Sequence, residues 1–134
     1  MSTWQRTQWS KRNWLFAAIL LSVLALAAEP SKYTGTWASS NSDSNGKITM
    51  SLGTSPDDST VTFTISTYEV KTKVKSLKVD GDAVMVAYEF DLQDTRLLST
   101  VTAKRNGSKL DGRYVTTIAG GSDQVDSGTF QASK

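Results

Sequence analysis

Side chains capable of catalysis are scarce in this chain, because its 134 residues include no histidine and no cysteine. A serine or cysteine nucleophile activated by histidine is therefore excluded, as is a zinc site of imidazole and thiolate ligands. Two carboxylates, Glu89 and Asp91, share one strand face, opposite the apolar side chains of the same segment. Unpaired charges are rarely buried, so we expect both in water. We interpret the protein as not an enzyme, with a carboxylate-based enzyme kept only as a third hypothesis.

One segment has part of the spacing of a calcium site. Residues 41–46 read Asn-x-Asp-x-Asn-Gly, the first half of an EF-hand loop, but Leu52 stands where the bidentate glutamate belongs. Asn and Gly also accept left-handed backbone conformations in polar hairpin loops. We therefore interpret the segment as a loop and expect neither a metal nor a cofactor.

Six aromatic side chains fall on the faces that alternation predicts to point inward. They can either wall a cavity for one small apolar ligand or fill the interior of a small barrel, which is just wide enough for side chains or one ligand. These candidate ligand-binding residues are Trp37, Phe63, Tyr88, Phe90, Tyr114 and Phe130.

Four lysines form the only one-sided charge feature, and they are Lys71, Lys73, Lys75 and Lys78. Such a row can bind an anionic polymer, a lipid head group or an acidic partner. Equally, lysines keep an outward face soluble and discourage edge pairing. No aromatic residues for base stacking alternate with them, so we expect no nucleic-acid partner.

The segment 70–90 organises the strands that must position these residues. Its Asp-Gly pair at 80–81, flanked by alternating apolar residues, predicts a hairpin whose two central residues have positive φ. The apolar phase changes between Val74 and Leu77. A β-bulge near residues 75–76 would return all the apolar side chains to one face and leave the lysines on the other.

The same alternation, interrupted by turn residues, predicts eight strands in an all-β fold. Every connection is short, and short connections join neighbouring antiparallel strands. We therefore predict an eight-stranded antiparallel up-and-down meander closed into a small barrel, because closure removes both exposed edges. The alternative is a two-sheet sandwich, whose crossovers require longer loops.

The N-terminal residues have the layout of an export signal. Three basic residues precede the apolar segment 14–28, and Ala25 and Ala27 fit a cleavage site. We predict a signal-peptide helix at 1–27, a short lead at 28–32 and a β-barrel domain at 33–134. The alternative is a retained membrane anchor, for which the apolar segment is shorter than the about 20 residues of a span.

The predicted cleavage changes the charge of the chain. It removes three of the 15 basic residues and none of the 13 acidic ones, which leaves 12 − 13 = −1. A nearly neutral domain offers no electrostatic attraction for nucleic acid. We expect a secreted or periplasmic monomer with no membrane contact after cleavage.

Short motifs in the predicted domain resemble the calycin group, the lipocalin-like and avidin-like barrels. Gly35-Thr36-Trp37 is similar to the Gly-x-Trp of their first strand. The segments 74–82 and 110–114 are similar to small exported bacterial barrel domains of unassigned function. The resemblance implies a barrel that binds a small hydrophobic or amphiphilic ligand at its mouth, near Trp37, Tyr88 and Tyr114.

A second hypothesis assigns the domain to a different class of protein. Small Gly-x-Trp barrels also inhibit proteases, so by analogy this one can be a secreted protein-binding or protease-inhibitor-like module. It would act through residues 28–32, its loops or its lysine-rich strand. A ligand carrier should contain a cavity lined by the six aromatic residues, whereas a protein-binding module should have a packed interior.

Overall fold

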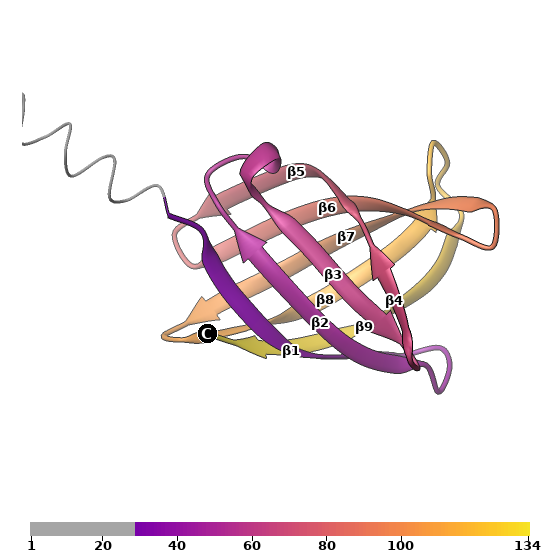
Figure 1. Ribbon diagram of the computed structural model, residues 1–134, viewed down its shortest axis with the longest axis horizontal. Coiled ribbons are helices and arrows are strands. Elements are labelled where there is room, and N and C mark those ends of the chain that lie inside the picture. Colours follow the sequence, from indigo (N-terminus) through magenta and orange to yellow (C-terminus); the bar gives the residue numbers. More distant parts are fainter. Residues whose placement is uncertain (1–28) are drawn as a thin grey trace, which may run out of the picture.

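The computed structural model describes residues 29–134, which form an antiparallel sheet of nine strands (Figure 1). The strands are β1 (Ser31–Ser39), β2 (Asn45–Leu52), β3 (Thr60–Ile65), β4 (Tyr68–Lys71), β5 (Lys73–Asp80), β6 (Ala83–Leu92), β7 (Thr95–Asn106), β8 (Lys109–Ile118) and β9 (Gln124–Ser133). A short 3-10 helix, η1 (Pro56–Asp58), connects β2 to β3. The predicted signal peptide, 1–27, lies outside the described residues. Within 29–134, no helix is long and apolar enough to cross a membrane.

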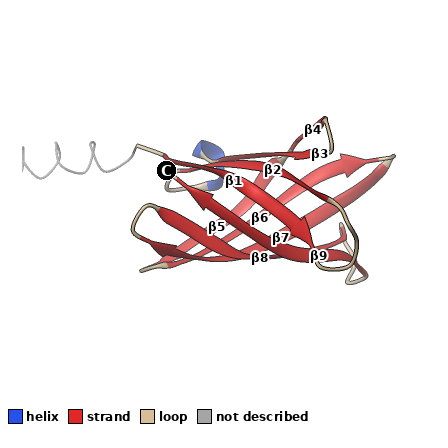
Figure 2. Ribbon diagram, turned by 90° about the horizontal axis from the view of Figure 1, so that it is seen from below, coloured by secondary structure: helices blue, strands red, loops and turns tan. Residues whose placement is uncertain are grey.

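The strands follow one another as a meander that curls into a half-barrel (Figure 2). Their order in the sheet is β4-β3-β2-β1-β9-β8-β7-β6-β5, and β1 pairs with β9. The first and last strands of the described chain therefore meet in the middle of the sheet. The predicted all-β antiparallel meander is confirmed, and the sandwich alternative is wrong because all nine strands belong to one sheet.

The prediction of eight strands closed into a barrel by a continuous ladder is wrong at one place. The segment 70–79 divides at Thr72 into β4 and β5, which are the two ends of the strand order. The Thr72 hydroxyl donates a 2.7 Å hydrogen bond to the Val61 carbonyl of β3, which fixes the chain where it crosses between these ends. Among the described strands no backbone ladder joins β4 to β5, so a seam remains there.

The predicted β-bulge is confirmed. Val74 pairs with Tyr88 and Ser76 with Ala87, so Lys75 is the extra residue in β5. The bulge restores the inward phase: Val74 is buried and Leu77 packs against the core. The four lysines of β4 and β5 are all exposed, as predicted.

The hairpin between β5 and β6 forms one residue later than predicted. Asp80 pairs with Ala83, so the turn consists of Gly81 and Asp82. Only Gly81 has a positive φ, 60°. That is the pattern of a type II′ turn, which has glycine at its first central position. The predicted positive φ at Asp80 is therefore wrong, because that residue is the last of the strand.

One end of the half-barrel is packed. It contains the beginning of β1, the end of β2 and the beginning of β8, and its largest fully buried side chains include Tyr33, Met50 and Leu110. The connection through η1 adjoins this end. There the Asp58 carboxylate accepts hydrogen bonds from the backbone N–H groups of Thr54 and Ser55, at 3.2 and 2.9 Å.

Candidate functional site

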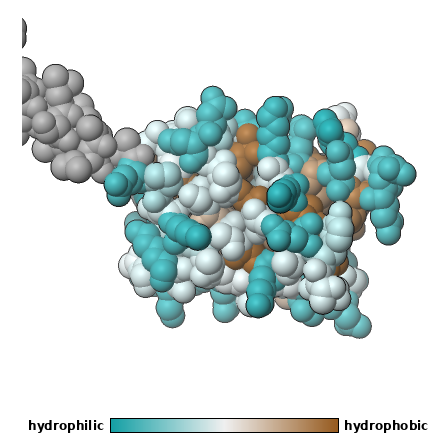
Figure 3. All heavy atoms as spheres, viewed as in Figure 1, coloured by the Kyte–Doolittle hydropathy of each residue, from teal (hydrophilic) through white to brown (hydrophobic). Residues whose placement is uncertain are grey.

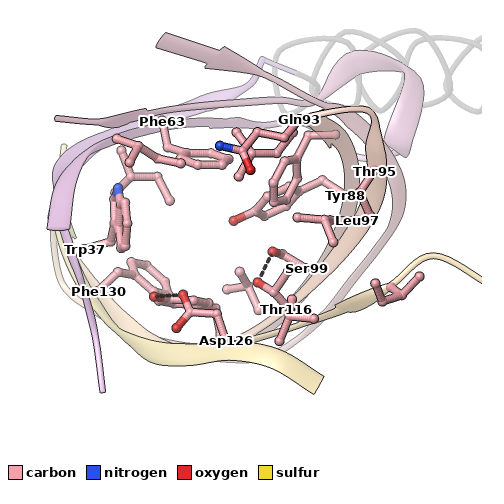
Figure 4. Close-up of a pocket in the computed structure, with 18 residues that line it drawn as sticks. Trp37, Phe63, Tyr88, Gln93, Thr95, Leu97, Ser99, Thr116, Asp126 and Phe130 are labelled. Atoms are coloured by element: carbon pink, nitrogen blue, oxygen red, sulfur yellow. Dashed lines mark hydrogen bonds between the residues drawn. The ribbon is translucent and has the colours of Figure 1, made fainter. Parts of the chain in front are cut away.

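The opposite end of the half-barrel contains a pocket of about 410 Å³. Its walls come from β1, β2, β3, β6, β7, β8 and β9 (Figure 4). This volume lies within the range of about 300–1,000 Å³ that small-molecule sites occupy. All six aromatic residues that the sequence nominated line it: Trp37, Phe63, Tyr88, Phe90, Tyr114 and Phe130. The structure therefore brings together, around one cavity, residues that are up to 93 positions apart (130 − 37).

The aromatic rings pack edge to face against one another along the pocket wall. Trp37 meets Phe63 edge to face with centroids 6.1 Å apart, and it meets Tyr114 in the same way at 6.0 Å. Phe63 and Phe90 form a third such pair at 5.0 Å. Each pair contributes about 0.5–1.5 kcal/mol beyond the burial of its area. The wall is therefore held in place by its own contacts.

The orientation of Trp37 has two further causes. Its indole Nε1–H donates a 2.9 Å hydrogen bond to the Thr64 carbonyl. Gly46, its pairing partner on β2, has no side chain, and a Cβ there would lie 2.8 Å from the indole nitrogen. The indole thus lies across β2 toward β3 because glycine leaves that space open.

A polar cluster lies on the β6–β7–β8 wall of the pocket. The hydroxyls of Ser99 and Thr116 are 2.6 Å apart in a buried hydrogen bond. Figure 4 shows the Tyr88 hydroxyl pointing into the pocket toward Ser99. Burial raises the pKa of Tyr88 to about 12, although the nearby Ser99 hydroxyl opposes this shift. Tyr88 is therefore neutral at physiological pH and can donate a hydrogen bond to a ligand.

One carboxylate, Asp126 of β9, also lines the pocket. Its Oδ1 accepts a 2.6 Å hydrogen bond from the Ser39 hydroxyl, and its Oδ2 accepts one of 2.9 Å from the Tyr114 hydroxyl. Burial and the adjacent carboxylate both raise the pKa of Tyr114. Gly128 makes room for this arrangement, since a Cβ there would lie 2.7 Å from the Tyr114 ring.

Sequence reasoning missed Asp126 and the other polar lining residues. The sequence marks the last strand by the alternation of Gly128, Phe130 and Ala132, whereas β9 already begins at Gln124. A usable signal was present, because Asp126 is in phase with Gly128, Phe130 and the other inward residues of that strand. The missed polar lining residues are Gln93, Thr95, Ser99, Thr116 and Asp126.

The lysine row lies apart from the pocket. Lys71 is on β4 and the other three lysines are on β5, and none of them lines the cavity. They flank the seam at which the sheet is not joined. Figure 3 shows hydrophobic surface between hydrophilic side chains on the face that β2, β3 and β4 present. The two predicted sets of site residues therefore belong to different surfaces.

The remaining candidates for chemistry lie on the outer face or in a loop. Asp91 is exposed, as predicted, and accepts hydrogen bonds from Arg96 at 3.0 and 3.2 Å. These bonds hold the pKa of Asp91 below its usual value. Residues 41–44 belong to the connection between β1 and β2. Among residues 29–134, no group of three or more His, Cys, Asp and Glu is placed to hold a metal ion.

No protein-family model, no curated protein and no solved structure matches this chain. What the pocket does is therefore inferred from its own geometry and chemistry.

Proposed function

We propose that this chain is an exported, non-catalytic protein that binds a small hydrophobic or amphiphilic ligand in a calycin-like barrel. One observation carries the proposal: a pocket of about 410 Å³, walled by six aromatic residues, at one end of the sheet. Such a pocket offers a ligand apolar contact on most sides and a few hydrogen-bonding groups, which is the usual composition of small-molecule sites.

The polar groups of the pocket favour binding over catalysis. The Ser99 and Thr116 hydroxyls bond to each other, and Asp126 is held by Ser39 and Tyr114. Catalysis by a serine hydroxyl requires an adjacent base that accepts its proton. Here the partner of the Ser99 hydroxyl is a second hydroxyl. These groups can orient a ligand, and they lack the arrangement that activates a nucleophile.

The calycin-like reading is supported by how the Gly-x-Trp motif is used. Gly35 pairs with Ala132 of β9, and a Cβ at Gly35 would lie 2.6 Å from the Ala132 backbone. Trp37, two residues on, forms part of the pocket wall. The motif thus joins the first and last strands and supplies one wall of the site. Contacts between β3 and β5 across the seam support a barrel closed by packing at that point.

The test is calorimetric titration of the full chain with decanol, a neutral amphiphile. Ile118 lies at the pocket rim and is 37% exposed, so tryptophan at this position should fold and obstruct the cavity. We expect Ile118→Trp to weaken decanol binding about tenfold or more, the equivalent of ~1.4 kcal/mol.

The matched control is Val115→Trp. Val115 is on the same strand with 40% exposure, but it does not line the pocket. Its substitution should leave decanol affinity unchanged. Equal effects of the two substitutions on decanol affinity, or no binding either of decanol or of a decyl chain with a charged head group, would contradict a carrier function.

The second candidate function is a protein-binding module that acts through the lysine-rich strand. It is favoured by the exposed lysines of β5, a strand whose outer edge has no ladder partner among the described strands. An extended acidic peptide could add to such an edge. The titration separates the two functions, because a peptide-binding edge does not predict that Ile118→Trp affects decanol binding.

A further inference from the structure

The charge of the pocket lining is one-sided. Asp126 is the only carboxylate among the described residues that line it, and these residues include no lysine and no arginine. The nearby basic residues point elsewhere: Arg96 pairs with Asp91 and Glu89 on the outer face, and Arg113 of β8 is exposed. A ligand in the cavity therefore meets one negative charge and no positive one from this part of the chain.

Asp126 retains capacity to bind a donor from a ligand. Ser39 and Tyr114 each occupy one position, on different oxygens. A carboxylate offers about four lone-pair positions, so each oxygen can accept one more hydrogen bond. Figure 4 shows the carboxylate projecting from β9 into the ring of side chains, on the part of the wall between Trp37 and Thr116. The two donors hold it in that position.

The aromatic wall next to this carboxylate also suits a positive charge. Tyr114 touches both partners: its hydroxyl bonds to Asp126, and its ring packs against Trp37. Cations are attracted to the faces of aromatic rings, most strongly to tryptophan. An ammonium group beside Asp126 would therefore have a carboxylate and aromatic rings as neighbours.

An anionic head group would be disfavoured at the same place. Moving an ion from water into an apolar site costs free energy unless an opposite charge compensates for it. In this pocket the only charged group within the described lining is also negative, and it would repel a carboxylate or a sulfate.

From this arrangement we infer that the pocket selects amphiphilic amines: ligands with an apolar body and an ammonium group that binds Asp126. The inference rests on the proposed carrier function and deepens it. The ammonium donates hydrogen bonds to the carboxylate, and the apolar body lies between the aromatic walls. Fatty acids, whose heads are anionic, are excluded from the ligand class.

The experiment compares three probes with the same alkyl chain: decylamine, decanol and decanoic acid, which at neutral pH are cationic, neutral and anionic. Each is titrated into the full chain by calorimetry, below the concentration at which it aggregates. A hydrogen bond to a charged group is stronger than one between neutral groups, so we expect decylamine to bind at least about tenfold more tightly than decanol. Decanoic acid should bind most weakly.

Asp126→Asn removes the charge and preserves the shape of the side chain. We expect it to reduce the preference for decylamine over decanol about tenfold, and the ratio remains meaningful if the substitution alters the pocket slightly. Asp123→Asn is the matched control, because Asp123 is exposed three residues away and does not line the cavity. It should retain the full preference.

The outcomes distinguish this inference from the proposed function. If decanol binds and Ile118→Trp blocks it, but decylamine shows no preference or decanoic acid binds as tightly, the amine specificity is wrong and the carrier function stands. Equal losses of preference in Asp126→Asn and Asp123→Asn would also overturn it, because they would indicate attraction by net charge alone. If none of the three probes binds, both proposals are wrong.

Discussion

The two ends of this half-barrel are built by the same sheet, yet one is packed and the other is hollow. At the packed end, side chains such as Met50 and Leu110 are fully buried. At the hollow end, inward residues that include six aromatic rings surround a pocket of about 410 Å³. The alternation along the strands is the same at both ends, so it cannot be the cause of the difference.

The two ends differ in which strands contribute to them. β5 pairs with β6 only as far as Lys73, opposite Glu89. Beyond that point Phe90 pairs with β7 alone, and the other edge of the sheet is β4, whose Val70 lies opposite Phe63. No ladder joins β4 to β6 among the described strands, so the pocket lies beside a seam between unpaired strands. The same alternation can therefore fill one end of a sheet and leave a pocket at the other.

The chemistry of the side chains reinforces this difference. Aliphatic residues at the packed end are flexible enough to interdigitate and fill space. The rings at the hollow end instead pack edge to face with their neighbours on the wall, as Trp37 does with Phe63 and Tyr114. Rings held against the wall do not extend to the centre of the pocket.

The largest expected effect compares a leucine from each end. Leu110→Ala should lower the free energy of unfolding by about 2–5 kcal/mol, because it leaves a closed void in packed surroundings. Leu97 already borders the pocket. Leu97→Ala should therefore cost at least about 1 kcal/mol less, since it creates little new closed volume. Urea unfolding measures both values, and equal losses would show that the two ends are packed alike.

Alkaline pH should weaken the hollow end through Tyr88. Its pKa is about 12 in the folded protein against an ordinary value of 10.0. As the pH rises, the unfolded chain loses this proton before the folded protein does. The stability that the neutral Tyr88 side chain contributes is therefore complete below about pH 10 and is lost as the pH rises toward 12. At about 1.4 kcal/mol per pKa unit, the loss is at most about 3 kcal/mol.

The control for this pH dependence is Tyr88→Phe, which has no phenolic proton. The quantity to measure is the difference in unfolding free energy between the two proteins at each pH, because all their other side chains are the same. Between about pH 10 and 12 the protein with Tyr88 should lose stability relative to Tyr88→Phe. A constant difference would indicate that the Tyr88 hydroxyl is in water.

The smallest expected effect concerns one buried hydroxyl at the packed end to which no described residue forms a hydrogen bond. The Tyr33 hydroxyl is buried and has no hydrogen-bond partner among the described residues, while Lys134 lies 5.6 Å from its ring. A buried unsatisfied group costs about 1–3 kcal/mol, so Tyr33→Phe should stabilise the protein by about 1 kcal/mol. Tyr114→Phe should do the opposite, because it removes the hydrogen bond to Asp126. Destabilisation by Tyr33→Phe would reveal an unseen partner for that hydroxyl.

Local rules predicted most of the fold. Alternation identified the inward faces of the strands, including Val84, Val86 and Tyr88, all of which are buried. The phase change before the hairpin located the bulge to within one residue, because a bulge is a local event that shifts the register of one strand. The turn itself was misplaced by one residue, because Asp80 extends the ladder before the chain reverses.

The candidate site was only half predictable. The six aromatic residues were identified because they are in phase with the core, but the same phase is compatible with a filled interior. Asp126 was missed because β9 starts earlier than its apolar residues indicate, so the sequence pattern assigned this residue to no strand. No local pattern marked Thr72 as the point at which the sheet stops being joined.

By itself, the sequence determined which side chains point inward, because the period of two is a property of each strand alone. Only the tertiary structure decided whether those side chains meet or enclose a space. That outcome depends on distances across the curved sheet between residues far apart in the chain, and on the seam between β4 and β5. The period of two sets the face to which each side chain points, and the curvature of the whole sheet sets the distance between side chains on facing strands.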